Sequence, residues 1–210
     1  MLRLALAVLL ASAVVTGAAA AASPPPQLLH PSSLHAKAPA VYHVSFKTTR
    51  GTFVVTVHRV WAPAGADRFY NLVRARFFDG VTFFRVVKGF VVQFGISPYP
   101  TVSKVWQNAD LKDDPVKLSN TPGTITYADA GPNTRTTQVF VNLGSNAGLD
   151  TQGFAPFGRV TSGMRVVDRL YGGYGEKPTN DQPQIAAKGN AFLHKTFPKL
   201  DSIVTARIAG

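Results

Sequence analysis

The sequence contains no cysteine, and this absence excludes several kinds of chemistry. Without thiols the chain has no disulfide framework, no thiolate nucleophile, no cysteine-based zinc or iron–sulfur site and no lipid-modified N-terminal cysteine. It also lacks a Gly-x-Ser-x-Gly nucleophile turn, and its five histidines are isolated, with no pair at metal-ligand spacing. We therefore expect no hydrolytic nucleophile, no metal and no cofactor.

Acidic side chains are few, and three of them gather in one short stretch, Asp110, Asp113 and Asp114. The stretch lacks the glycine and the final glutamate that a calcium-binding loop requires. We therefore interpret these carboxylates as a solvated loop face.

Positive charge dominates, with a formal net charge of +11, but the basic residues are scattered and never form a run of five. Binding to phosphate backbones depends on clustered Lys and Arg, so no specific nucleic-acid partner is expected. A solvated basic surface on an exported protein explains the charge. Weak binding of anionic cell-envelope polymers remains an alternative role.

The 210 residues are 45% hydrophobic, which suits one globular domain with a large core. Residues 1–22 have one early cation, an apolar stretch and a final run of small residues, as in an export signal. The alternative is an uncleaved membrane anchor. We expect a flexible Pro/Ala-rich tether over 23–40, a domain over 41–210 and a periplasmic or secreted protein without a stable membrane partner after cleavage.

Period-two alternation of apolar residues predicts eight strands, and spacing of three and four predicts an amphipathic helix over 63–77 and a second one from about 162. Residues 97–121 are expected to be mostly loop, and 184–197 could form a short helix. This pattern predicts a mainly β fold, a closed eight-stranded antiparallel β-barrel capped by two α-helices. The strands are expected within 41–60 as a hairpin, within 81–95 as a pair, and at 123–128, 136–144, 154–160 and 200–208.

One strand pair carries polar residues in an unusual setting, because Arg85 and Gln93 each lie among Val and Phe. Burying such groups without partners is unfavourable by several kcal/mol. Alternation alone allows both residues to point to solvent from the polar side of the sheet. Taken alone, the pattern leaves a functional site and a solvated face both open.

Three segments decide between these interpretations, because the chain resembles the cyclophilin family of peptidyl-prolyl isomerases over roughly 41–208. The segments are FFDGVTFFRVVKGFVVQFG, GTITYADAGPNTRTTQVFVNLG and LDTQGFAPFGRV, in the order and spacing of the family. The resemblance implies that Arg85 is the catalytic arginine. It also implies a substrate groove formed by Phe90, Val91, Gln93, Ala128, Asp129, Gln138, Phe140, Leu149 and Phe154.

Several positions depart from the common pattern of that family. Phe84 replaces a usual His, Phe94 and Ile96 replace the Gly and Asp of a frequent Gly-Gly-Asp ending, Val91 replaces a Met, and Val139 replaces a Phe. The resemblance therefore implies altered support of the site and a shallower groove wall. Gly148 stands where cyclosporin-sensitive members carry Trp, so tight cyclosporin binding is not expected.

The resemblance implies a monomeric isomerase that accelerates rotation about X-Pro bonds in exported proteins as they fold, with proline-containing polypeptides as substrates. Such a reaction breaks no bond, which agrees with a sequence that has neither nucleophile nor metal ligands. The alternative is a chaperone or scaffold module that binds proline-containing peptides with weak or lost turnover.

Overall fold

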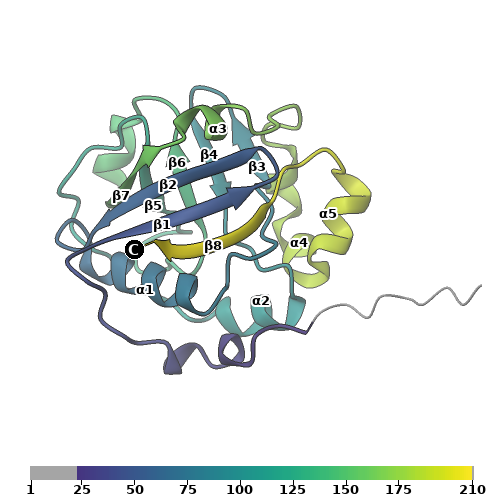
Figure 1. Cartoon of the computed structure of the whole chain (residues 1–210), viewed down its shortest axis with the longest axis horizontal. Helices are drawn as coiled ribbons and strands as arrows, with labels where there is room; N and C mark the ends of the chain where they lie inside the picture. Colours follow the sequence, from purple (N-terminus) through teal and green to yellow (C-terminus); the bar gives the residue numbers. More distant parts are fainter. Residues whose placement is uncertain (1–22, 210) are drawn as a thin grey trace, which may run out of the picture.

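The computed structural model describes residues 23–209, in which one antiparallel sheet of eight strands curls around the core (Figure 1). Its strands run in the order β3-β4-β6-β5-β7-β2-β1-β8. The strands are β1 (Val41–Thr48), β2 (Gly51–His58), β3 (Arg85–Val87), β4 (Val91–Phe94), β5 (Thr124–Tyr127), β6 (Val139–Asn142), β7 (Pro156–Ser162) and β8 (Ile203–Ala209).

The sheet is an open half-barrel, so the prediction of a closed barrel was wrong. β3 and β8 lie at the two ends of the strand order and share no ladder. Only the isolated bridge Thr82↔Ser202 and a few backbone hydrogen bonds join the chain ahead of each strand, as from Phe83 N–H to the Asp201 carbonyl at 3.0 Å. The edge of β3 that faces away from β4 is bridged at Val86 by Gly175, so the contact does not extend into a closing ladder.

The described chain contains five α-helices rather than the two that were predicted. A helix occupies part of 97–121, which was expected to be mostly loop, and the segment around 184–197 forms two helices separated at Gly189, whose φ is +59°. The helices are α1 (Pro63–Arg74), α2 (Pro100–Trp106), α3 (Met164–Asp168), α4 (Gln182–Lys188) and α5 (Asn190–Thr196).

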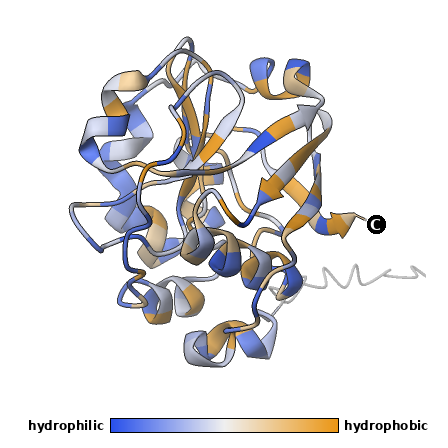
Figure 2. Ribbon diagram, turned by 90° about the vertical axis from the view of Figure 1, so that its left-hand side faces the viewer, coloured by the Kyte–Doolittle hydropathy of each residue, from blue (hydrophilic) through white to orange (hydrophobic). Residues whose placement is uncertain are grey.

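The helix α1 confirms the amphipathic pattern, although it ends at Arg74. Pro63 occupies its first turn, where a missing N–H leaves no hydrogen bond unmade, and Ala66, Phe69 and Val73 are buried on one side. Orange and blue residues alternate along the helices in Figure 2, as expected for elements that cover a core with one face. α1 lies below the sheet and α3 above it in Figure 1.

The N-terminal hairpin is confirmed, with Thr48 opposite Gly51 across a two-residue turn. Tyr42, Val44 and Phe46 all point into the core, as their alternation predicted. Phe46 lies within 6.0 Å, between ring centroids, of Phe78 and Phe94, so aromatic rings from distant segments fill the half-barrel.

Residues 23–40, expected as a flexible tether, pack against the domain instead. Leu28 is buried, and its carbonyl accepts a 2.8 Å hydrogen bond from Nε1 of Trp106. Asn71 of α1 exchanges two hydrogen bonds with the backbone of Ala36. The apolar Leu28 and these paired backbone groups attach the segment, which includes the 3₁₀ turns η1 (Pro26–Leu29) and η2 (Pro31–Ser33).

The expected export signal over 1–22 lies outside the described residues. Between residues 23 and 209, no helix is long and apolar enough to cross a membrane.

Candidate active site

The pairing register of three strands places the candidate polar and aromatic residues in one row. Arg85 of β3 lies opposite Gln93 of β4, which in turn lies opposite Phe140 of β6. Residues directly paired across strands point to the same face of a sheet. The neighbouring row is buried in the core, so the two faces of these strands separate a site from the packed interior.

This row borders a pocket of about 210 Å³. Nine of the ten candidate residues line it, and Gln138 lines the cavity next to it. The arginine therefore reaches a hollow with aromatic walls instead of pointing freely to solvent. The lining residues are Arg85, Phe90, Val91, Gln93, Ala128, Asp129, Phe140, Leu149, Phe154, Thr179 and Gln182.

The Arg85 guanidinium has partners on several sides. Its Nη1 donates to Oε1 of Gln93 at 2.9 Å, and its Cζ lies 5.2 Å from the centre of the Phe90 ring. Its Nε and Nη2 donate to the two carboxylate oxygens of Glu176 at 2.7 and 2.8 Å. Its side chain remains 21% exposed, so the group stays accessible from the pocket mouth.

A glycine sets the position of the polar side chains beside the arginine. Gly95 follows β4 with a φ of +113°, and a Cβ there would lie 2.4 Å from the carbonyl oxygen of Thr137. This close approach brings the chain ahead of β6 against the end of β4. As a result Nε2 of Gln93 donates to Oε1 of Gln138 at 2.9 Å.

The apolar half of the pocket comes from β6 and the loop that follows it. Phe140 is almost fully buried and meets Phe154 edge to face, with ring centroids 5.8 Å apart. Leu149 and Val91 complete this part of the wall. A small saturated ring would meet the apolar side chains of this wall, which suits the side chain of proline.

Asp129 supplies a carboxylate at the boundary between the pocket and a second cavity. Burial raises the pKa of Asp129 because it disfavours the charged form, and a hydrogen bond from the Gly131 N–H opposes this rise. The second cavity, of about 640 Å³, lies between loop 128–138 and the helices α2 and α4. An extended peptide leaving the small pocket therefore has room to continue.

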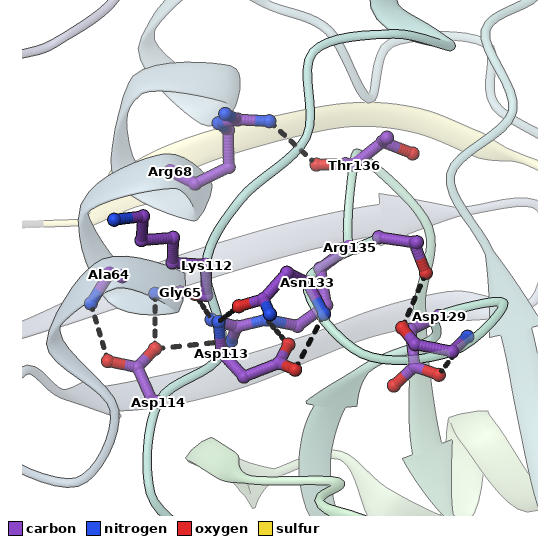
Figure 3. A network of polar contacts seen from close by, with 12 residues as sticks. Ala64, Gly65, Arg68, Lys112, Asp113, Asp114, Asp129, Asn133, Arg135 and Thr136 are labelled. Carbon is purple, nitrogen blue, oxygen red and sulfur yellow. Dashed lines mark hydrogen bonds and ion pairs between the residues drawn. The ribbon is translucent and has the colours of Figure 1, made fainter.

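Loop 128–138 is held by a buried ion-pair network (Figure 3). The Asp114 carboxylate accepts hydrogen bonds from the backbone N–H groups of Ala64 and Gly65, both at 2.9 Å, and from Nη1 of Arg135 at 3.1 Å. Asp113 and Asn133 exchange backbone-to-side-chain hydrogen bonds. The interpretation of this acidic cluster as a solvated loop face was therefore wrong for Asp114, which is buried.

A second polar network supports the loop that carries Leu149. Asn120 is fully buried and donates from Nδ2 to Asp150 and to the Phe154 carbonyl, both at 2.8 Å. Desolvation would raise the pKa of Asp150, but hydrogen bonds from Ser119 and Asn120 together lower it. These bonds hold both apolar loop residues of the pocket in place.

The departures from the family pattern take different places in the structure. Phe94 belongs to the main core and does not reach the groove. Phe84 forms a separate apolar cluster with Ile185 and Leu193, and Ile96 packs against the same cluster. Phe84 and Ile96 therefore belong to the surface on which α4 and α5 pack. Gly148 is exposed, and a Cβ there would meet no atom within 4 Å.

Sequence reasoning missed Glu176, Thr179 and Gln182. All three lie in the segment that leads into α4, and Gln182 is the first residue of that helix. Thr179 and Gln182 line the pocket, and Glu176 binds Arg85. The only signal for Glu176 was its rarity, because it is the single glutamate of the chain. Neither periodicity nor a motif connects this segment with β3, 91 residues earlier.

The sequence of this chain is similar to a known protein family and to several of its members. Residues 43–188 match the model of the family described as "Cyclophilin type peptidyl-prolyl cis-trans isomerase/CLD". The chain is 33% identical over 131 residues to the peptidyl-prolyl cis-trans isomerase ppi1 of Schizosaccharomyces pombe, covering 61% of this chain and 84% of that protein. It is 33% identical over 144 residues to a peptidyl-prolyl cis-trans isomerase of Acinetobacter baylyi, covering 66% of this chain and 75% of the relative.

The fold is also shared with a solved structure. A cyclophilin-type peptidyl-prolyl cis-trans isomerase of Cryptosporidium parvum superposes with a TM-score of 0.61 at 18% identity, covering 81% of this chain and 98% of that one. At this identity the likeness shows the fold alone. With the family match spanning most of the described residues, the chain belongs to the cyclophilin-type peptidyl-prolyl cis-trans isomerases, enzymes that act on proline-containing peptides.

Proposed function

We propose that this isomerase acts on exported proteins as they fold, as a monomer, with Arg85 as the catalytic residue and the 210 Å³ pocket as the proline site. The observation that carries the proposal is the position of the Arg85 guanidinium at the edge of a pocket lined by Phe90 and Phe140. Export is supported by the composition of residues 1–22.

The reaction explains why a cation beside an apolar pocket is sufficient. Rotation about an X-Pro bond requires the loss of amide resonance, a barrier of about 18–20 kcal/mol, and no bond is broken. A site therefore accelerates it by binding the twisted amide better than either planar form. The reaction requires neither a nucleophile nor a metal.

In the twisted amide the proline nitrogen regains its lone pair and can accept a hydrogen bond. Arg85 can donate that bond, because its guanidinium carries N–H donors and no acceptor. Meanwhile Phe140, Leu149 and Phe154 hold the proline ring, so that rotation moves the carbonyl ahead of it. Gln138 and the backbone near Asp129 lie where they can bind the flanking peptide.

The proposal is tested with a protease-coupled assay on a short prolyl peptide. Arg85→Ala should reduce kcat/KM by about a hundredfold or more, because a preorganised donor of this kind contributes on the order of 3 kcal/mol. Arg165→Ala, which removes the same charge from an exposed position on α3, should leave the rate unchanged. Wild-type protein that does not accelerate the reaction would refute the proposal.

A peptide-binding module with weak turnover is the second candidate, favoured by the changes at Phe84, Phe94 and Ile96, which pack behind the strands of the site. NMR exchange between cis and trans signals of a bound peptide distinguishes the two functions. An isomerase broadens or transfers these signals at catalytic concentration, whereas a binding module shifts them without exchange.

The export component has an independent test. N-terminal sequencing of the native protein should find a mature end just after one of the residues 18–22. An intact Met1 would refute signal cleavage and favour a retained N-terminal anchor.

A further inference from the structure

The segment between α3 and β8 brings an additional wall to the pocket. It contains the 3₁₀ turn η4 (Lys177–Asp181) followed by α4 and α5, which lie beside the β3 end of the sheet in Figure 1. Phe84 packs against Ile185 and Leu193 of these helices in a buried cluster. The segment is therefore attached to the strand that carries Arg85 by apolar packing.

The attachment continues along the backbone up to the site. Gly175 forms an isolated antiparallel bridge with Val86, the residue after Arg85. This bridge places the next residue, Glu176, directly beside the guanidinium. The two carboxylate oxygens of Glu176 then accept one hydrogen bond each from Nε and Nη2, at 2.7 and 2.8 Å.

The guanidinium keeps free donors in this arrangement. It has five N–H groups, of which Glu176 uses two and Gln93 uses one, so five minus three leaves two N–H groups on the terminal nitrogens. The pair is bidentate, and two bonds to one carboxylate restrict both the direction and the rotation of the arginine fork. Arg85 is thus held on two sides and still has donors for a third partner.

The polar contacts extend across the floor of the site and return to the same segment. Gln93 accepts from Arg85 and donates to Gln138, and Nε2 of Gln138 donates to Oε1 of Gln182 at 2.9 Å. Gln182 is the first residue of α4. Both ends of this relay therefore lie on one segment, six residues apart.

We infer that Glu176 is a positioning residue of the isomerase, which holds the Arg85 guanidinium so that its two free N–H groups serve the twisted amide. Glu176 is 54% exposed, so the ion pair contributes little to folding. A long, flexible arginine that is oriented before substrate arrives needs no reorganisation in the transition state. The inference rests on the proposed catalytic role of Arg85.

The test compares three variants in the coupled assay and by NMR. Glu176→Ala should lower kcat about tenfold, because a misdirected catalytic donor loses transition-state stabilisation, while KM changes less than about twofold. Glu176→Gln, which keeps one acceptor oxygen, should fall between this variant and wild type. Asp181→Ala is the control, because it removes a carboxylate from the same segment that makes no hydrogen bond to the N-terminus of α4. Its kcat and KM should match those of wild type.

A spectroscopic measurement separates positioning from a general structural effect. The ¹H–¹⁵N signal of Arg85 Nε, assigned through its loss in Arg85→Ala, should move upfield and exchange faster with water in Glu176→Ala. The backbone amide signals of the pocket should stay in place. Asp181→Ala should leave the Arg85 signal unchanged.

The outcomes distinguish this inference from the function on which it rests. Wild type that shows no turnover would refute the proposed function. Wild type that is active, with Glu176→Ala equally fast or faster, would refute the positioning role and show that the carboxylate is neutral or attenuating. An unchanged Arg85 Nε signal in Glu176→Ala would also refute it.

Discussion

Arg85 and Arg135 each form an ion pair with a carboxylate, Arg85 with Glu176 and Arg135 with Asp114, but the surroundings of the two pairs differ. The Arg135 and Asp114 side chains are 4% and 7% exposed, whereas those of Arg85 and Glu176 are 21% and 54% exposed. Arg135 also donates to the carbonyl of Lys112, within the network of polar contacts around the loop (Figure 3). The same pair of charged groups therefore supports the loop in one place and leaves donors for a substrate in the other.

The comparison shows that burial distinguishes an ion pair that stabilises the fold from one that is available for function. In the buried pair every acceptor of Asp114 has a partner, because an unpaired charge there would be strongly unfavourable. In the exposed pair water can replace either partner, so the pair is weak in stability and free to serve another purpose. The following experiments test this division.

The largest effect is expected from Arg135→Ala. It leaves the buried Asp114 without its cation, so the free energy of unfolding should fall by about 3–5 kcal/mol in urea titrations. Arg85→Ala should change the same quantity by less than about 1 kcal/mol although it abolishes most turnover. Equal losses of stability in the two variants would break the comparison.

The ion pair of Arg59 with Asp67 is intermediate in burial, and the pH dependence of stability tests its contribution. Their bidentate bonds are 2.7 and 2.8 Å long, and both side chains are about one quarter exposed. Desolvation would raise the pKa of Asp67, but hydrogen bonds from Arg59 and the Ala38 N–H, with the nearby positive charge, lower it. Because the folded pKa lies below the unfolded one, this carboxylate stabilises the fold above about pH 4 and loses its effect as pH falls through the folded pKa.

Asp67→Asn should therefore reduce the free energy of unfolding by about 1 kcal/mol near pH 7. The difference from wild type should shrink as the pH falls below about 4, where both proteins carry a neutral group. Urea titrations at pH 7, 5, 4 and 3 measure it. A difference that stays constant over this range would show that the charge of Asp67 does not stabilise the fold.

The smallest effect is expected from Glu176→Gln on stability. The exposed pair should contribute less than about 0.5 kcal/mol, and this difference should disappear in about 1 M salt, where charges are screened within about 3 Å. The loss in the free energy of unfolding caused by Arg135→Ala should persist at the same salt concentration. A salt-resistant loss above about 1 kcal/mol for Glu176→Gln would place this pair with the buried one.

Much of the fold could be predicted from local patterns, and the pocket residues were implied by the resemblance to the cyclophilin family. Alternating residues such as Val44 and Phe46 identified the strands, and the spacing of Phe69 and Val73 identified α1. Nine of the ten candidate residues line one pocket, in which strand register aligns Arg85, Gln93 and Phe140 and the loops supply most of the others. The helix α2, within a polar and proline-containing stretch, showed no comparable signal.

The packing of the N-terminal segment and of α4 could not be predicted for a related reason. Leu28 is one of three leucines in a Pro-rich stretch, and only the Trp106 side chain and the core around it show that it is the buried one. Phe84 was recognised as a departure, but its partners Ile185 and Leu193 lie about a hundred residues away. The sequence shows that these apolar residues are present, but it does not show which surface each of them packs against.

By itself the sequence determined the strands, the first helix and the absence of thiol chemistry, because each depends on residue identity or on spacing within a few positions. The aromatic pocket residues were implied by the resemblance to a family. Only the tertiary structure decided that the half-barrel stays open, that Asp114 is buried and that Glu176 meets Arg85. The last two features depend on contacts between residues 21 and 91 positions apart, which form only once the chain has folded.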